Sequence, residues 1–133
     1  ADNTHNDHFY NGVGIQNVYL GSYTSVVDGT VTSGASLSDL VAHDDEALDT
    51  EMKTKLNAAV IALGKIKFAA EAGFAYDQML ERGNAGGESL IMGGVNGLID
   101  QTASIERVVA ALSLDGIEFE GSDSLDNPDA VFE

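Results

Sequence analysis

The 133-residue chain has no cysteine and no tryptophan, and its one proline is Pro128. Without thiols the chain can form neither a disulfide framework nor a thiolate metal site, so any metal ligands must be histidine or oxygen-bearing side chains. No apolar run approaches the ~20 residues that a membrane-spanning helix needs, and we expect no transmembrane segment. The start of the chain is polar and shows no signal-peptide pattern.

Basic residues are also scarce. Six Lys and Arg residues stand against 22 Asp and Glu residues, which gives a formal net charge of −16, and no basic residue precedes Lys53. An acidic protein of this kind repels nucleic-acid phosphates and attracts cations. We therefore expect no nucleic-acid partner. Solubility in a saline habitat is the alternative explanation of the same charge.

The length favours a single helical domain over residues 1–133. A helix is predicted from near Thr4, which with Asp7 resembles a capping box, to about Leu20. Its predicted buried side carries Phe9, Val13 and Leu20. Five further residues form the adjoining strip: His5, His8, Gly12, Gln16 and Tyr19.

The middle of the chain predicts a loop or small hairpin over residues 26–36, then a short helix over 37–43 that Ser36 or Ser38 caps. A longer helix is predicted over residues 45–67, with acidic residues in its first turn. Six apolar residues recur there at helical spacing and predict its buried stripe: Leu48, Met52, Leu56, Ala59, Leu63 and Ile66.

The last third predicts a short helix over residues 74–80 and the longest helix over 87–114. The expected buried stripe of the longest helix is Leu90, Ile91, Val95, Leu98, Thr102, Ile105, Val109 and Leu112. Gly93, Gly94 and Gly97 each cost about 1 kcal/mol relative to Ala in a helix. They indicate either the close approach of another helix or a ligand, or a locally distorted helix.

Residues 117–133 alternate apolar and polar side chains before turning at Asn127-Pro128, which predicts an extended strap across the bundle. The predicted fold class is therefore all-α: a helical bundle of three to four main helices with a long irregular connection and an extended C-terminal strap.

His5 and His8 lie three residues apart, so on a helix their imidazoles project from one face. Asp2 or Asp7 could add a carboxylate, and such a set suits zinc, iron or copper without choosing among them. The alternative is that Asp2, Asn3 and Thr4 only cap the helix and the histidines only pack.

Other motifs carry less chemistry. His43 and Glu46 form an HxxE spacing, but the acidic residues around them fit a helix N-terminus and a solvated surface. The tail GSDSLDNPD lacks the order of an EF-hand calcium loop. No nucleophile elbow, phosphate loop, dinucleotide fingerprint or HExxH motif occurs, so we assign no catalytic residue.

Four blocks of the sequence resemble one known family: DNTHNDHFYNGVGIQNVYLGSYT, SGASLSDLVAHDDEALDTEM, QTASIERVVAALSL and IEFEGSDSLDNPDAVF. They are similar to the C-terminal half of imelysin-like proteins, a family of iron-regulated periplasmic or outer-membrane proteins that has been classed as the M75 peptidases. The resemblance implies a two-part helical protein whose site lies between the halves.

The family's GxHxxE signature belongs to the N-terminal half and does not occur in this chain, where Val41 rather than Gly stands two positions before His43. The family's SDNTHxD block is matched from Asp2 to Asp7, with Ala1 in the place of Ser. The resemblance therefore implies a metal site at His5, Asp2 and Asp7 and ligand-binding roles for Asn3, Thr4 and His8.

The resemblance also implies a function. We expect the C-terminal domain of an envelope-located protein for iron or other metal-ion uptake, with iron or zinc bound at a site shared with an N-terminal half. That half would belong to the same polypeptide or to a separate fragment. One alternative is half of a metal-dependent M75-type peptidase, although this chain holds no complete catalytic motif. The other is a structural or partner-binding helical domain without metal.

Overall fold

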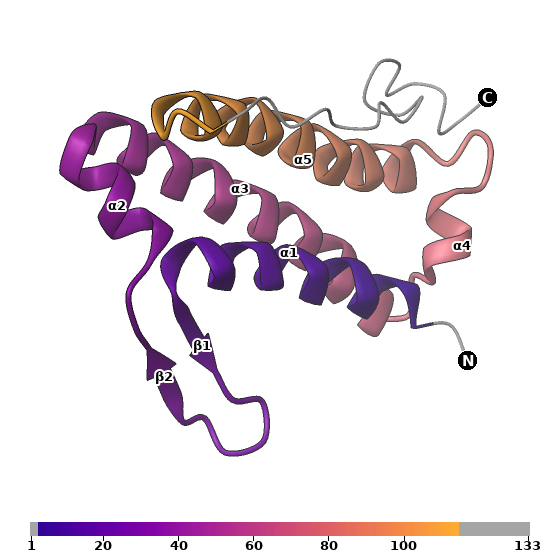
Figure 1. The fold of residues 1–133 in the computed structure, drawn as a ribbon. Coiled ribbons are helices and arrows are strands. Elements are labelled where there is room, and N and C mark those ends of the chain that lie inside the picture. Colours follow the sequence, from indigo (N-terminus) through magenta and orange to yellow (C-terminus); the bar gives the residue numbers. More distant parts are fainter. Residues whose placement is uncertain (1–2, 115–133) are drawn as a thin grey trace.

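The computed structural model describes residues 3–114; residues 1–2 and 115–133 lie outside the described part. The elements, in chain order, are α1 (Thr4–Leu20), β1 (Ser22–Thr24), β2 (Val31–Ser33), α2 (Leu37–Asp44), α3 (Glu46–Glu71), α4 (Tyr76–Met79) and α5 (Ala85–Ala111). The predicted all-α helical bundle is confirmed (Figure 1). The strap predicted for residues 117–133 falls outside the described residues.

Helix α3 is the centre of the bundle, with α1 packed along one side and α5 along another (Figure 1). Both flanking helices run antiparallel to α3, and α2 packs against the N-terminal end of α3. Across residues 3–114 no helix is long and apolar enough to cross a membrane.

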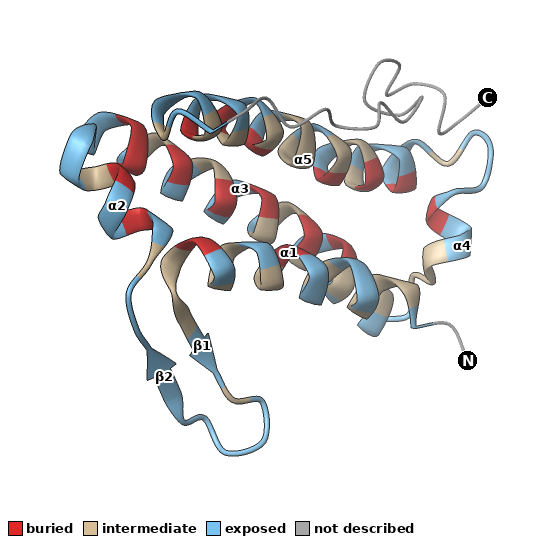
Figure 2. Ribbon diagram, in the orientation of Figure 1, coloured by how far each residue is buried: buried red, intermediate tan, exposed pale blue. Residues whose placement is uncertain are grey.

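The buried stripe predicted for α3 is confirmed at all six positions, from Leu48 to Ile66. Five of the six residues belong to two apolar clusters. The cluster near α2 contains Tyr19, Val41, Leu48, Met52, Leu56 and Val108. The cluster near α4 contains Leu63, Ile66, Met79 and Ile91. Figure 2 shows these buried residues on the sides of the helices that face one another.

Helix α1 begins at Thr4, as predicted, but the predicted capping box is wrong. The residue before the helix is Asn3, and its side chain makes no capping hydrogen bond. The predicted buried face is also shifted, because Gly12 and Tyr19 from the adjoining strip are the buried residues. A Cβ on Gly12 would lie 2.6 Å from Leu63 Cδ1, so the missing side chain lets α1 approach α3 closely.

Helix α5 shows the same shift toward small residues. Its buried positions are Gly87, Ile91, Gly94, Gln101, Ser104 and Val108, and only Ile91 of these belongs to the predicted stripe. A Cβ on Gly97 would lie 3.1 Å from Ala59 Cα, and one on Gly94 would lie 3.0 Å from Ile66 Cδ1. Close helix approach therefore explains Gly94 and Gly97, whereas Gly93 faces open space.

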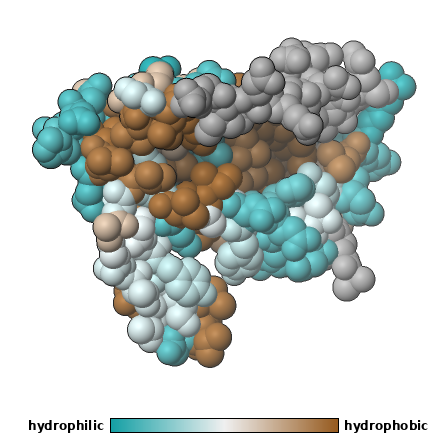
Figure 3. All heavy atoms as spheres, viewed as in Figure 1, coloured by the Kyte–Doolittle hydropathy of each residue, from teal (hydrophilic) through white to brown (hydrophobic). Residues whose placement is uncertain are grey.

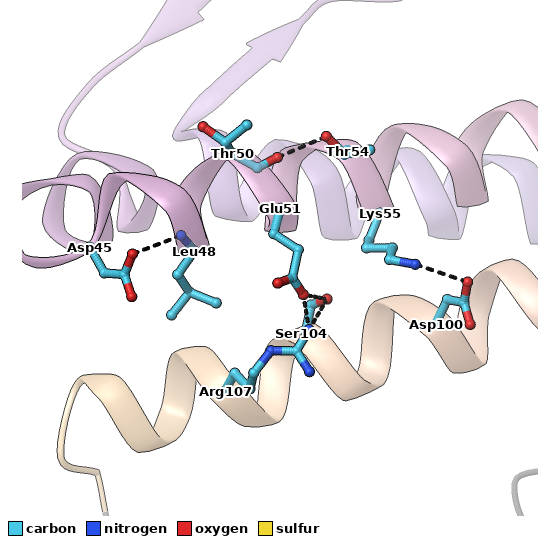
Figure 4. Close-up of polar contacts among 9 residues, drawn as sticks. All are labelled: Asp45, Leu48, Thr50, Glu51, Thr54, Lys55, Asp100, Ser104 and Arg107. Carbon is cyan, nitrogen blue, oxygen red and sulfur yellow. Dashed lines mark hydrogen bonds and ion pairs between the residues drawn. The ribbon is translucent and has the colours of Figure 1, made fainter.

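Polar contacts between α3 and α5 fix how the two helices align (Figure 4). Glu51 accepts a 2.7 Å hydrogen bond from the Ser104 hydroxyl and forms an ion pair with Arg107. The Lys55 ammonium donates to Asp100 over 3.1 Å. These pairs join residues about 50 positions apart, so they hold one register of the two helices.

The connection over residues 21–36 contains a projecting hairpin. The loop or hairpin predicted over residues 26–36 covers its turn and second strand, whereas its first strand precedes the predicted range. Its strands pair antiparallel, with Tyr23 opposite Thr32. The Ser36 hydroxyl then accepts from the Asp39 backbone N–H at 2.9 Å and caps α2, which confirms one predicted cap. Helix α4 is shorter than the predicted 74–80 helix.

Candidate functional site

A polar depression of about 630 Å³ lies where the start of α1 meets the end of α3. Its lining combines amide, phenol, carboxylate and ammonium groups: Asn3, Asn6, Asp7, Tyr10, Asn11, Lys67 and Glu71. Lys67 forms an ion pair with Glu71, and its ammonium lies 5.8 Å from the centre of the Phe9 ring. The depression can therefore offer hydrogen-bond donors and acceptors together with the exposed carboxylate of Asp7.

His5 lies beside this depression, on the side of α1 that faces α3, since Gly12 two turns later packs on Leu63. Its Nε2 lies 3.2 Å from the Asn6 amide nitrogen, which also donates to Asn3 Oδ1 at 2.9 Å. Its Nδ1 is buried and has no hydrogen-bond partner among residues 3–114. Because buried polar atoms are normally paired, this nitrogen is the clearest unmet bonding capacity at the site.

The metal ligands predicted from the sequence do not converge within the described residues. His5 and Asp7 are two positions apart on α1, which separates their directions by about 200°. Asp7 is exposed and lines the depression, whereas His5 is half-buried. Asp2 lies outside the described residues. Over residues 3–114 no group of three or more His, Asp and Glu side chains could hold a metal ion.

The predicted ligand-binding residues divide between two places. Asn3 lines the depression and accepts from Asn6, and Thr4 opens α1 as a half-buried residue. His8 is elsewhere: its ring lies 5.4 Å from the Tyr76 ring, centroid to centroid, against α4. His5 and His8 thus lie near each other on α1, but their rings contact different residues.

The HxxE spacing does not form a site. His43 lies in the last turn of α2, which ends at Asp44, and Glu46 begins α3 after the non-helical residue Asp45. The His43 side chain is 85% exposed, and its Nδ1 lies 2.8 Å from Asp44 Oδ1. The surface reading of this segment therefore fits the structure.

Sequence reasoning missed a buried carboxylate. Asp49 was not singled out from the sequence, yet its side chain is almost fully buried. It accepts hydrogen bonds from the Tyr19 hydroxyl at 3.0 Å, from the Ser38 hydroxyl at 2.7 Å and from Lys53 at 2.7 Å. The available signal was its place next to Leu48 in the buried stripe, four residues before Lys53.

The electrostatics of this cluster follow from its burial. Burial alone would raise the pKa of the Asp49 carboxyl, but the hydrogen bonds from Lys53, Ser38 and Tyr19 outweigh it and hold that pKa below its ordinary value. Burial, followed by the bond to Asp49 and its charge, raises the pKa of the Tyr19 hydroxyl. The cluster ties α1 and α2 to α3 and keeps its charge paired.

Comparison with known proteins adds one finding. The family model Peptidase M75, described as imelysin, matches residues 1–105. The match includes the polar depression and its surroundings. No curated protein matches the chain.

Proposed function

The chain belongs to the imelysin family, and from this premise we propose that it is the C-terminal domain of a cell-envelope protein that takes up iron or another metal ion. In this proposal the start of α1 is one wall of the ligand site. The opposite wall comes from an N-terminal imelysin half, in the same polypeptide or in a separate fragment.

The observation that carries the proposal is the unpartnered, buried Nδ1 of His5 beside the polar depression. A histidine nitrogen without a partner is costly in a folded protein, and an incoming ligand atom would complete its bonding. Asn6 contacts both His5 and Asn3, so it links this ring to the lining of the depression.

The metal ligands available at the start of α1 also explain why the proposed site needs a second wall from another part of the protein. His5 supplies one imidazole, and Asp7, which points in another direction on α1, supplies one carboxylate in the lining of the depression; both are ligand types that iron and zinc accept. Over residues 3–114 no group of three or more such side chains could hold a metal ion. The proposal therefore draws the remaining ligands from Asp2 and from the other half. The net charge of −16 favours the approach of a cation.

The test is a calorimetric titration of the intact protein, with both halves present, using Fe²⁺ and then Zn²⁺. We expect His5→Ala to abolish one binding step and Asp7→Asn to weaken it. Asn6 contacts the ring without being a ligand, so Asn6→Ala should weaken the same step by about 10-fold or more, as loss of an orienting neighbour does.

His43→Ala is the matched control, since His43 is an exposed histidine whose imidazole pairs with its neighbour Asp44. Its isotherm should match that of the unmodified protein. An unchanged isotherm for His5→Ala would remove the assignment, as would an equal loss in the control. Metal-dependent cleavage of a peptide in the same samples would favour the peptidase alternative over uptake.

A further inference from the structure

Two apolar hollows lie along α3 between α1 and α5, on a different part of the surface from the polar depression, and together we call them the apolar groove. One end is a hollow of about 280 Å³ lined by Ile15, Val18, Tyr19, Leu37, Met52, Ile105, Val108, Val109, Leu112 and Leu114. The other end is a hollow of about 90 Å³ lined by His8, Leu63, Ile66, Tyr76, Ile91, Gly94, Val95 and Leu98. Figure 3 shows hydrophobic surface gathered between the two flanking helices.

The groove is open, apolar and uncharged. Val18 is 71% exposed and Leu114 is 55% exposed, although both line the larger hollow. No lining residue of either hollow is Asp, Glu, Lys or Arg. Leaving such surface in water is unfavourable by about 25 cal/mol for each Å² of apolar area, so an occupant with apolar side chains would be stabilised here.

The chain itself continues directly from this groove. Leu112 and Leu114 line the larger hollow, and 19 residues of the sequence follow Leu114. In extended form those residues reach about 60 Å, whereas the 27 residues of α5 span about 40 Å. The segment is therefore long enough to return along the whole groove toward α4.

The sequence of this segment also suits the groove. Ile117 and Phe119 alternate with Glu118 and Glu120, and in extended backbone this alternation places both apolar side chains on one face. We propose that residues 117–132 of this chain fill the apolar groove between α1 and α5, with Ile117 and Phe119 in the larger hollow. The acidic side chains of the segment then face water.

The absence of cysteine makes this proposal directly testable in the full chain. The double variant Val18→Cys with Phe119→Cys places one thiol on the exposed rim of the groove and one in the segment. Mild oxidation forms a disulfide only when the two Cα atoms come within about 7 Å. We expect a monomeric cross-linked product, seen as faster migration on a non-reducing gel.

The matched control is Ile61→Cys with Phe119→Cys. Ile61 is 52% exposed on α3, and it lies about 200° around the helix from the groove residue Leu63. Because both thiols of each pair belong to one chain, tethering raises their effective concentration in both variants. Only docking of the segment in the groove would favour the Val18 pair over the Ile61 pair. We expect a severalfold higher monomeric yield for the Val18 pair. Because Val18 and Ile61 are exposed, neither substitution should impair folding, which circular dichroism verifies.

Salt provides a second measurement. The segment is acidic and the described residues 3–114 carry 14 acidic against 6 basic residues, so high salt should raise the yield by screening their repulsion. Equal yields for the two pairs would overturn the proposal. A dimeric product would overturn it, because the segment of a second copy would then fill the groove. The absence of any cross-linked product would also overturn it, because the groove would then be open to a different partner. None of these outcomes depends on metal binding, so they are independent of the proposed function.

Discussion

Replacing Asp49 is expected to destabilise the fold more than replacing any exposed carboxylate. Asp49→Ala removes the acceptor for Tyr19 and Ser38 and leaves both hydroxyls buried without it. Each buried group that loses its partner costs about 1–3 kcal/mol. Lys53 is half exposed and regains water, so its lost ion pair adds little. The sum is a loss of about 3 kcal/mol in the free energy of unfolding.

Two variants calibrate this magnitude. Tyr19→Phe removes one hydrogen bond but leaves Asp49 with its two other donors, so it should cost about 1 kcal/mol. Asp100→Ala is the matched control, because it also removes a carboxylate paired with a lysine, yet its side chain is 62% exposed. That change should cost at most about 1 kcal/mol. Urea unfolding followed by circular dichroism at neutral pH measures all three.

The pH dependence follows from the lowered pKa of Asp49. A carboxyl that is more acidic in the folded than in the unfolded protein stabilises the fold above the unfolded pKa, near 3.9. This contribution is lost as the pH falls through the folded pKa. The stability difference between the unmodified protein and Asp49→Asn should therefore shrink below about pH 4. A constant difference, or an Asp49→Ala cost no larger than that of Asp100→Ala, would refute the reasoning.

Three further outcomes are expected from unfolding experiments. Gly93→Ala should stabilise by up to about 1 kcal/mol, because its Cβ meets open space, whereas Gly97→Ala should destabilise, because its Cβ meets the α3 backbone at 3.1 Å; opposite signs in the urea midpoint check the pair. Gly12→Ala should cost about 1–3 kcal/mol by overpacking, while Gly14→Ala, with nothing within 4 Å, should not lower the melting temperature. Raising the salt concentration should stabilise the unmodified protein, since screening weakens the self-repulsion of a net charge of −16; a flat urea midpoint across salt would contradict this.

The sequence predicted α3 well because one force determines its pattern. Its six apolar side chains recur at helical spacing, and all six are buried. The buried faces of α1 and α5 were misjudged for a common reason. Hydrophobic periodicity marks large side chains, but close helix contacts here are made at Gly12, Gly94 and Gly97, whose lack of a side chain admits the neighbouring helix. No scale of hydrophobicity ranks such a position first.

The site was predicted less completely than the fold. The sequence singled out His5 and Asp7, and the structure places both at the start of α1 beside one polar depression. It could not show that they point in different directions once α1 is docked, or that Lys67 and Glu71 arrive from the far end of α3. Asp49 was missed because burial of a carboxylate depends on donors brought from two other helices.

The central position of α3 has a consequence for local opening. Because α1 and α5 each pack on α3, α1 can detach while the α3–α5 interface, with its glycine contact and its polar pairs, stays closed. Such partial opening costs less than global unfolding, so amide protons of α1 should exchange with solvent faster than those at the centre of α5. A molecule held at the start of α1 would bind only the closed form and slow that exchange. Occupancy of the site could thus be read from hydrogen exchange along a helix 17 residues long.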